Sequence, residues 1–301
     1  MYPNSFRYYR AASLQGAASQ LAELGEDARA IAGGQSLIPL MKLRLSRPSA
    51  LVDLNFIPGL SQIEKRDGAI LFGAMTRHSE IEASGTASQI PILHDCAAGI
   101  ADVQVRNRGT IGGSLAEADP SGDWGPVLLT LSTEVHCVGP KGNRSILLSE
   151  FFRDAYTTAL GHGELLRKVT VRLPPKNSGG AYLAFKRCAP VYASASAAVQ
   201  LTMEDREICK EARVVLGCVG LTPVCATQAE RELRGRKIGP KTIEAAADAA
   251  MMAADPQSDM RGSAEYKRVL VRSLVKRTIE IALRRSRGEH VEVSHEYVGR
   301  A

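Results

Sequence analysis

Two short segments of the sequence place a pair of glycines directly before polar side chains. They are AGGQS at residues 32–36 and TIGGS at residues 110–114. Glycine lacks a Cβ, so it tolerates positive φ and lets a ligand approach the backbone, and successive N–H groups in such a turn form a nest for an anionic oxygen. We therefore expect two nests that face each other and hold the two phosphates of a dinucleotide. A tight turn is the simpler explanation of a single glycine pair, and it stays open for the matched pair.

Charged residues flank the second glycine pair. Arg106 and Arg108 precede it and could balance phosphate charge, although exposure to solvent or a place at a subunit interface explains them equally. Asp119 and Asp123 follow it, and a carboxylate beside a phosphate site suits ribose or ribityl hydroxyls better than the phosphates themselves. For Asp119, a turn that opens the next helix is an equal alternative. Neither glycine loop is a GxGxxG or a Walker A motif, so the usual NAD and ATP architectures are not supported.

The cysteines and histidines form no pattern that is typical of a metal or iron–sulfur site. The six cysteines are Cys96, Cys137, Cys188, Cys209, Cys218 and Cys225. No CxxC occurs among them, which predicts scattered, reduced cysteines in the core of a cytosolic protein. His78 and His162 have no carboxylate or second histidine at metal or triad spacing, so we assign neither a catalytic role.

The bulk composition narrows the class of protein. At 301 residues the chain is long enough for about two domains, and its 45% hydrophobic and 23% charged residues are typical of a globular protein. A net charge of +6 is mild for this length and favours anionic small molecules or an acidic partner over nucleic acid. No apolar run approaches the ~18 residues of a membrane span, and the first residues lack the apolar region of a signal peptide. We therefore expect a cytoplasmic protein with no transmembrane segment.

The elements expected around the glycine loops mix helices and strands without regular βαβ alternation. A helix over 11–25 has Leu14, Ala18, Leu21 and Leu24 on one face and Gly25 at its end. A second helix over 91–100 begins at Pro91, and 126–139 is a helix or apolar stretch followed by a strand. The predicted strands are 28–32, 50–54 and 69–75.

Two prolines and two glycines within residues 171–180 predict a domain boundary. Beyond it we expect antiparallel strands over 193–203 and 211–220, and helices over 240–254 and 263–286. In the last helix one buried face is predicted from Tyr266, Leu270, Leu274, Ile281 and their neighbours. The RRSR cluster at 284–287 is expected in solvent at the helix C-terminus, where it favours the dipole.

Three segments resemble one known family: AGGQSLIPLMKLRL at 32–45, QVRNRGTIGGSLAEADPSGDW at 104–124, and YTTAL with the ELL that follows it. To about residue 285 the sequence is similar to the FAD-binding medium subunit of the molybdenum hydroxylases, as in carbon monoxide dehydrogenase and xanthine dehydrogenase relatives. The resemblance implies an α+β fold in which a two-lobed FAD-binding domain of the vanillyl-alcohol-oxidase (PCMH) type is followed by a smaller α+β domain. The implied division is 1–175 with lobes split near 55–60, 176–290 with an antiparallel sheet and helices, and a tail over 291–301.

The resemblance also implies the residues that bind FAD, with no catalytic residue and no metal ligand on this chain. The implied residues are Ile31, Ala32, Gly33, Gly34, Gln35, Ser36 and Leu37 in the first loop, Thr110, Ile111, Gly112, Gly113 and Ser114 in the second, Asp123 as a cofactor contact, Ala101 and Leu166 in the cleft, and Lys186 and Tyr192 near the flavin. Val191 stands where aspartate is common, and Glu117 stands where the closest relatives usually have histidine. For Lys186 an exposed side chain is an alternative, and for Tyr192 a packed aromatic at a domain junction.

In function, the resemblance implies an electron-transfer flavoprotein. A small [2Fe–2S] subunit, fed by a large molybdopterin subunit, supplies electrons that pass to NAD, a quinone or oxygen, in a dimer of heterotrimers. One alternative is a free-standing FAD oxidase or dehydrogenase, for which Tyr192 is the candidate acid–base group. The other is an interaction module of the same fold that has lost the cofactor, and the two intact glycine pairs argue against it.

Overall fold

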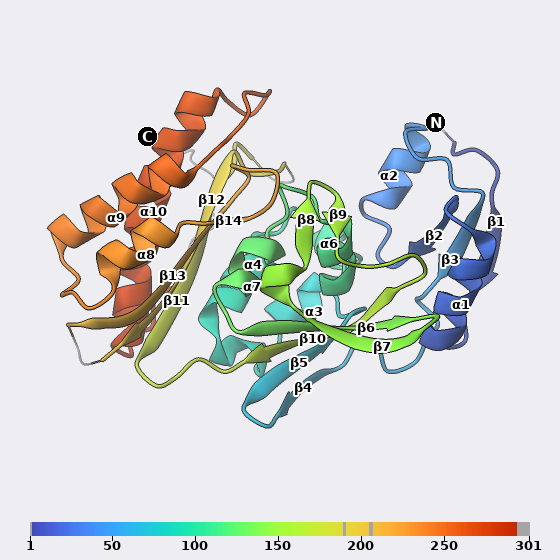
Figure 1. The fold of residues 1–301 in the computed structure, drawn as a ribbon, viewed down its shortest axis with the longest axis horizontal. Coiled ribbons are helices and arrows are strands. Elements are labelled where there is room, and N and C mark those ends of the chain that lie inside the picture. The colour runs from blue at the N-terminus through green and yellow to red at the C-terminus, as the bar shows by residue number, and fades with distance from the viewer. Residues whose placement is uncertain (1, 189–190, 205–206, 294–301) are drawn as a thin grey trace.

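The computed structural model describes residues 2–188, 191–204 and 207–293 (Figure 1). From residue 294 onward, the expected tail over 291–301 lies outside the described residues. Within the described ranges, no helix combines the length and the apolar character needed to cross a bilayer.

The N-terminal lobe is a small parallel sheet covered by a helix. Strands β1 (Arg7–Arg10), β3 (Ala50–Asp53) and β2 (Ala28–Ile31) pair in that order, all parallel. Helix α1 (Leu14–Leu24) confirms the predicted helix. It begins where the Ser13 side chain accepts a hydrogen bond from the Gly16 amide, and it ends at Gly25, which has a φ of +81°. The first glycine pair then connects β2 to the short helix α2 (Leu37–Lys42).

The second lobe is built on a five-stranded antiparallel sheet. Its strands, in sheet order, are β4 (Ile63–Arg66), β5 (Ala69–Gly73), β10 (Leu165–Arg172), β6 (Thr133–Gly139) and β7 (Gly142–Leu147). Short helices surround it: α3 (His78–Glu82), α4 (Pro91–Gly99), α5 (Val103–Arg106), α6 (Ile111–Glu117) and α7 (Trp124–Leu129). The remaining elements are the 3-10 turns Ala87–Gln89 and Leu148–Glu150 and the small hairpin β8 (Phe152–Asp154) and β9 (Thr157–Thr158). Fully buried Trp124, Phe72 and Phe151 form the centre of this core.

A second antiparallel sheet forms the C-terminal part. Its strands are β11 (Ser178–Phe185), β12 (Ala195–Met203), β13 (Cys209–Gly217) and β14 (Val224–Cys225). Helices α8 (Thr227–Leu233), α9 (Pro240–Ala253) and α10 (Ala264–Ser286) cover its outer face (Figure 1). The opposite face contacts the second lobe, because Tyr182 and Ala198 belong to the same core as the α4 residues Ile92 and Cys96. The two parts are therefore packed against each other through the sheet.

The buried face of α10 agrees with the prediction in part. Leu274 is buried and Leu270 and Ile281 are partly buried against the same core, whereas Tyr266 is 44% exposed. The fully buried residues of the face also include Val271, Val275 and Ile279, at a spacing of four residues. Apolar residues occupy more than one side of this helix, so periodicity alone did not identify the side that packs.

The prediction that RRSR lies in solvent is wrong for Arg285 and for Ser286, which is buried. Both terminal nitrogens of Arg285 pair with the Asp95 carboxylate of α4, at 2.6 and 2.9 Å, and the Arg285 side chain is buried. Nη1 also donates to the Gly180 carbonyl. Arg284 behaves as predicted and forms an exposed pair with Glu289. Arg285 therefore links the last helix to α4 across the junction between the two parts.

The cysteine prediction is correct in part. All six cysteines are free, and Cys96, Cys137 and Cys209 are buried. Cys218 is partly buried, whereas Cys188 and Cys225 are exposed. Cys225 is exposed because it lies on β14, the edge strand of the C-terminal sheet, and Cys188 follows the end of β11.

Candidate functional site

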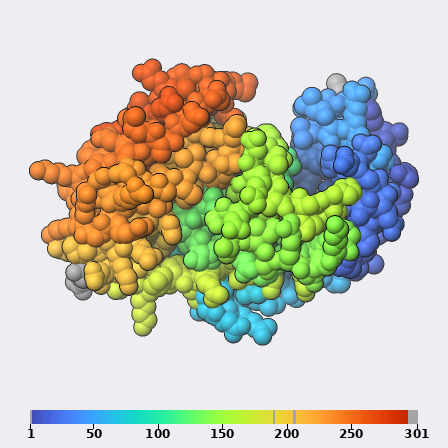
Figure 2. Space-filling view, in the orientation of Figure 1, coloured from blue at the N-terminus to red at the C-terminus, as the bar shows by residue number. Residues whose placement is uncertain are grey.

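A cleft of about 570 Å³ lies between the N-terminal lobe, the second lobe and the start of the C-terminal part. Figure 2 shows the surface hollowed between the blue N-terminal lobe and the rest of the molecule. A volume of this size is typical of small-molecule and cofactor sites. Sixteen of the seventeen predicted residues line it: Ile31, Ala32, Gly33, Gly34, Gln35, Ser36, Leu37, Ala101, Thr110, Gly112, Gly113, Ser114, Asp123, Leu166, Lys186 and Tyr192. Ile111 does not, because its side chain is 0% exposed within the core of the second lobe.

The first glycine loop has the geometry of a nest. Gly34 has a φ of +74°, which an L side chain rarely adopts. Within residues 2–188 of the structure, the amides of Gly33, Gly34 and Gln35 donate to no protein acceptor. Gly33 lies against the backbone that precedes the second loop, since a Cβ there would lie 2.8 Å from the Gly109 Cα. The free amides are suited to an anionic ligand, and the first loop packs directly against the backbone that leads into the second.

The second glycine pair does not form a nest, so that prediction is wrong. The amides of Gly113 and Ser114 both donate to Thr110, the first to its hydroxyl at 3.0 Å and the second to its carbonyl at 2.9 Å. The amide of Gly112 donates to the Ala74 carbonyl. This segment is the capped start of α6, and Gly112 is required because a Cβ there would lie 2.6 Å from the Ala74 Cβ. Thr110 and Ser114 line the cleft, but the backbone amides of this segment are used within the protein.

Asp123 and Lys186 form a buried pair at the wall of the cleft. Asp123 accepts a 2.7 Å hydrogen bond from the Tyr182 hydroxyl and lies 3.4 Å from the Lys186 ammonium. Lys186 also donates to the Gly99 carbonyl at 2.6 Å. At 7% exposure Lys186 is not the solvent-exposed lysine that was the alternative, because its acceptors come from the other half of the molecule. The second lobe therefore contributes the carboxylate of this pair, and the C-terminal part contributes the ammonium.

Tyr192 lies along the cleft and is not packed in a core, since it is 49% exposed. The Arg261 guanidinium lies 5.9 Å from its ring centroid. Burial of the hydroxyl, with the nearby Asp119 carboxylate, raises the pKa of Tyr192 well above its usual value. The phenol is therefore protonated at neutral pH, which argues against Tyr192 as a general base.

Arg106 and Asp119, two of the charged residues beside the second loop, have structural partners. Arg106 pairs with Glu82 at 2.9 Å and donates to the Ile100 carbonyl, and neither Arg106 nor Arg108 lines the cleft. The Asp119 carboxylate accepts from the Ser121 amide at 2.8 Å, which is the predicted turn, and it also lines the cleft. Glu117 lines the cleft as well, and burial with the nearby Asp119 charge raises its pKa.

His78 lines the cleft and has a role that the sequence analysis missed. Its Nδ1 accepts a 3.0 Å hydrogen bond from Trp124 Nε1, which can only donate. A neutral ring must then carry its proton on Nε2. Burial and the charges of Arg77 and Arg106 lower the pKa of His78 to about 3. No local motif could indicate this pair, because Trp124 is 46 residues from His78 in the sequence.

The neutral state of His78 predicts that the protein loses stability in acid. An unfolded histidine binds a proton near its usual pKa of 6.5, whereas folded His78 does so only near 3. Between these values the free energy of unfolding should fall by about 1.4 kcal/mol for each pH unit of acidification. Urea unfolding of the wild type and of His78→Gln, from about pH 6.5 to about pH 4.5, measures how the free energy of unfolding depends on pH. The difference between the two proteins should shrink toward acid pH, and equal pH slopes would contradict the prediction.

Comparisons with known proteins agree with this geometry. Residues 4–175 match the family described as the FAD binding domain in molybdopterin dehydrogenase, and residues 180–282 match the CO dehydrogenase flavoprotein C-terminal domain. The chain is 42% identical to the 6-hydroxypseudooxynicotine dehydrogenase complex subunit alpha of Paenarthrobacter nicotinovorans, over 98% of this chain and 100% of that protein. It is 38% identical to the carbon monoxide dehydrogenase medium chain of Afipia carboxidovorans, over 95% of this chain and 100% of that protein.

Among solved structures, a chain of carbon monoxide dehydrogenase from Hydrogenophaga pseudoflava, in a form that lacks the Mo-pyranopterin moiety, superposes with a TM-score of 0.92. It is 35% identical, with 95% of this chain and 99% of that chain covered. The predicted α+β fold, a two-lobed FAD-binding domain followed by a smaller α+β domain, is confirmed, and FAD is the cofactor. The chain therefore belongs to the family of FAD-binding medium subunits of molybdenum hydroxylases.

Proposed function

We propose that this chain is the flavin subunit of a molybdenum hydroxylase complex and holds FAD in the cleft described above. A small [2Fe–2S] subunit, supplied by a large molybdopterin subunit, delivers electrons, and an external acceptor such as NAD, a quinone or oxygen removes them. The observation that carries the proposal is the nest at Gly33 and Gly34, which lines a cleft of cofactor size and whose amides have no acceptor among the described residues. The family membership supports the same function.

The cleft residues fit FAD by their chemistry. The amides of Gly33 and Gly34 would bind the pyrophosphate, and the hydroxyls of Thr110 and Ser114 add donors beside it. Asp123 would accept from cofactor hydroxyls, and Lys186 neutralises its charge. FAD itself supplies the one-electron and two-electron chemistry, while the protein supplies position and electrostatics.

We propose the domain division at 1–175 and 176–290, because β10 ends at Arg172 in one sheet and β11 begins at Ser178 in another. We further propose that the complex is a dimer of heterotrimers and lies in the cytoplasm. Six cysteines without a disulfide support a reducing compartment. Within the described ranges, no cluster of three or more His, Cys, Asp or Glu side chains is placed to hold a metal ion.

The isolated chain is expected to carry FAD and to be inactive toward organic substrates. Denaturation and chromatography identify the cofactor, and anaerobic spectra follow flavin reduction by an aldehyde or a nitrogen heterocycle, first with the chain alone and then with its partner subunits. We expect reduction only in the complex. Rapid bleaching of the lone chain would favour the free-standing enzyme, and recovery of FMN would contradict the proposed FAD site.

A further inference from the structure

The acidic loop, defined as residues 118–123, is held in a strained conformation by distant segments. Its first residue, Ala118, has a φ of +48°, and its carbonyl accepts a 2.9 Å hydrogen bond from the Tyr156 amide. The Cys218 amide donates to the Pro120 carbonyl at 3.2 Å. Tyr156 and Cys218 also have positive φ, at +56° and +64°. Ala118 thus ends α6 in the left-handed region, and Tyr156 and Cys218, which share that conformation, bond to the loop from distant parts of the chain.

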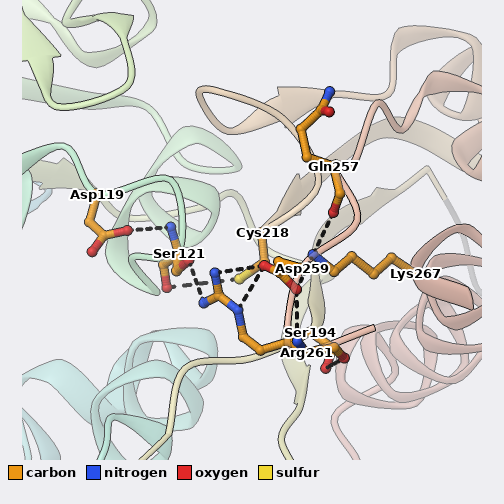
Figure 3. Close-up of polar contacts among 8 residues, drawn as sticks. All are labelled: Asp119, Ser121, Ser194, Cys218, Gln257, Asp259, Arg261 and Lys267. Atoms are coloured by element: carbon orange, nitrogen blue, oxygen red, sulfur yellow. Dashed lines mark hydrogen bonds and ion pairs between the residues drawn. The ribbon is translucent and has the colours of Figure 1, made fainter. Parts of the chain in front are cut away.

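Arg261 reaches the acidic loop from the C-terminal part (Figure 3). It lies in the connection between α9 and α10, and its Nη1 donates to the Ser121 hydroxyl at 2.9 Å. Its guanidinium also lies 5.9 Å from the Tyr192 ring centroid. Arg261 does not itself line the cleft, but both Tyr192 and Asp119, two residues before Ser121, do. It can therefore affect the cleft only through these neighbours.

Contacts within the C-terminal part also hold Arg261 in place. The Asp259 carboxylate accepts from its Nε at 3.1 Å and from its amide at 2.8 Å. The ammonium of Lys267, a buried residue of α10, lies 2.9 Å from the same carboxylate and donates to the Gln257 carbonyl. The Ser194 hydroxyl donates to the Arg261 carbonyl at 2.9 Å. Figure 3 shows these contacts on both sides of Arg261, so little side-chain freedom is left to lose.

Desolvation of Asp259 is outweighed by hydrogen bonds from Lys267 and Arg261, which lower its pKa to about 2. The Asp259 carboxylate is thus ionised at neutral pH, where it pairs with Arg261.

We infer that Arg261 is a positioning residue of the cofactor cleft: it sets the acidic loop through Ser121 and the Tyr192 ring through its guanidinium. This rests on the proposed function, in which FAD occupies the cleft. Tyr192 and the acidic loop line one cleft but belong to different halves of the molecule. Arg261 contacts both, so its loss changes the surroundings of the cofactor without removing a cofactor contact.

The test uses the full chain reconstituted with FAD. For Arg261→Ala we expect the dissociation constant of FAD to rise about tenfold, because a loop that has lost its charge-assisted hydrogen bond must be ordered again when FAD binds. The midpoint potential and the absorption spectrum of the bound flavin should shift as well. Arg261→Lys should restore part of the affinity. The matched control is Arg268→Ala, which removes an exposed cation of α10 that lies 3.8 Å from Asp255; it should change none of these values.

Ser121→Ala tests the same route if Arg261→Ala folds poorly, because it removes the acceptor and leaves Arg261, Asp259 and Lys267 in place. We expect it to weaken FAD binding and shift the potential in the same direction. Wild-type affinity, potential and spectrum in both variants would overturn the inference while leaving the proposed function intact. Failure of the wild-type chain to bind FAD would overturn both.

Discussion

A chain that carries Gly33→Val is expected to bind FAD about a hundredfold more weakly than the wild type, or not at all. A Cβ at residue 33 would lie 2.8 Å from the Gly109 Cα, so the backbones of the two loop regions must move apart. That movement disturbs the nest at Gly34 and the entry to α6 together. The C-terminal part should stay folded, since it has a separate core. Titration of the apoprotein with FAD, followed by flavin fluorescence, measures the affinity.

Two other glycines serve for comparison: Gly85 is the control, and Gly113 is a site where a smaller loss of FAD affinity is expected. Nothing lies within 4 Å of a Cβ at Gly85, so Gly85→Val should bind FAD as the wild type does. At Gly113 the Cβ would meet the Thr110 hydroxyl at 2.7 Å, and rotation of that side chain costs the helix cap, about 1 kcal/mol, and one hydroxyl donor beside the cofactor. Gly113→Val should therefore lose less affinity than Gly33→Val. Near wild-type affinity in Gly33→Val would show that this glycine serves only a turn.

Asp95→Ala is expected to lower the free energy of unfolding by about 3–5 kcal/mol, the usual cost of breaking a buried ion pair. It would leave the buried Arg285 guanidinium without its carboxylate and the Tyr182 amide without its acceptor. Urea unfolding followed by circular dichroism measures the change.

Arg284, the residue next to Arg285, provides the control for that measurement. Arg284→Ala breaks an exposed pair with Glu289, which is worth about 0–1 kcal/mol. If both charges are removed together, as in Asp95→Leu with Arg285→Met, most of the lost stability should return, because no unpaired charge remains. Equal effects of Asp95→Ala and Arg284→Ala would contradict the role given to the buried pair.

Elements with local signals at their ends could be predicted from the sequence. Ser13 and Gly25 bound α1, Pro91 begins α4, and Ser263 caps α10 by accepting from the Tyr266 amide. In each case the signal lies within one turn of the helix end that it marks, so it can be recognised from the sequence alone. Strand β1 was missed because RYYR has no apolar alternation and is stabilised by parallel pairing with β3, more than forty residues away.

The candidate site was predictable only where its chemistry lies in short motifs. The first glycine loop is such a case, and its free amides match the expectation. The environments of Lys186 and Arg285 were not predictable, because their acceptors lie 87 and 190 residues away. The second loop resembled the first in sequence, yet Thr110 and Ala74 use its amides within the protein. Which amides stay free depends on tertiary contacts that no motif contains.

The link between Asp95 and Arg285 also has a consequence for how the protein is made. The two residues are separated by 190 positions, so at about 5–20 residues per second a ribosome needs about 10–40 seconds to add the second after the first. During that time the Asp95 carboxylate is without its guanidinium partner, whereas the surface of α4 that contacts β11 waits only until residues 178–185 are made. Newly made chains therefore pass through a stage in which the acid is unpaired, and translation must be nearly finished before that stage can end.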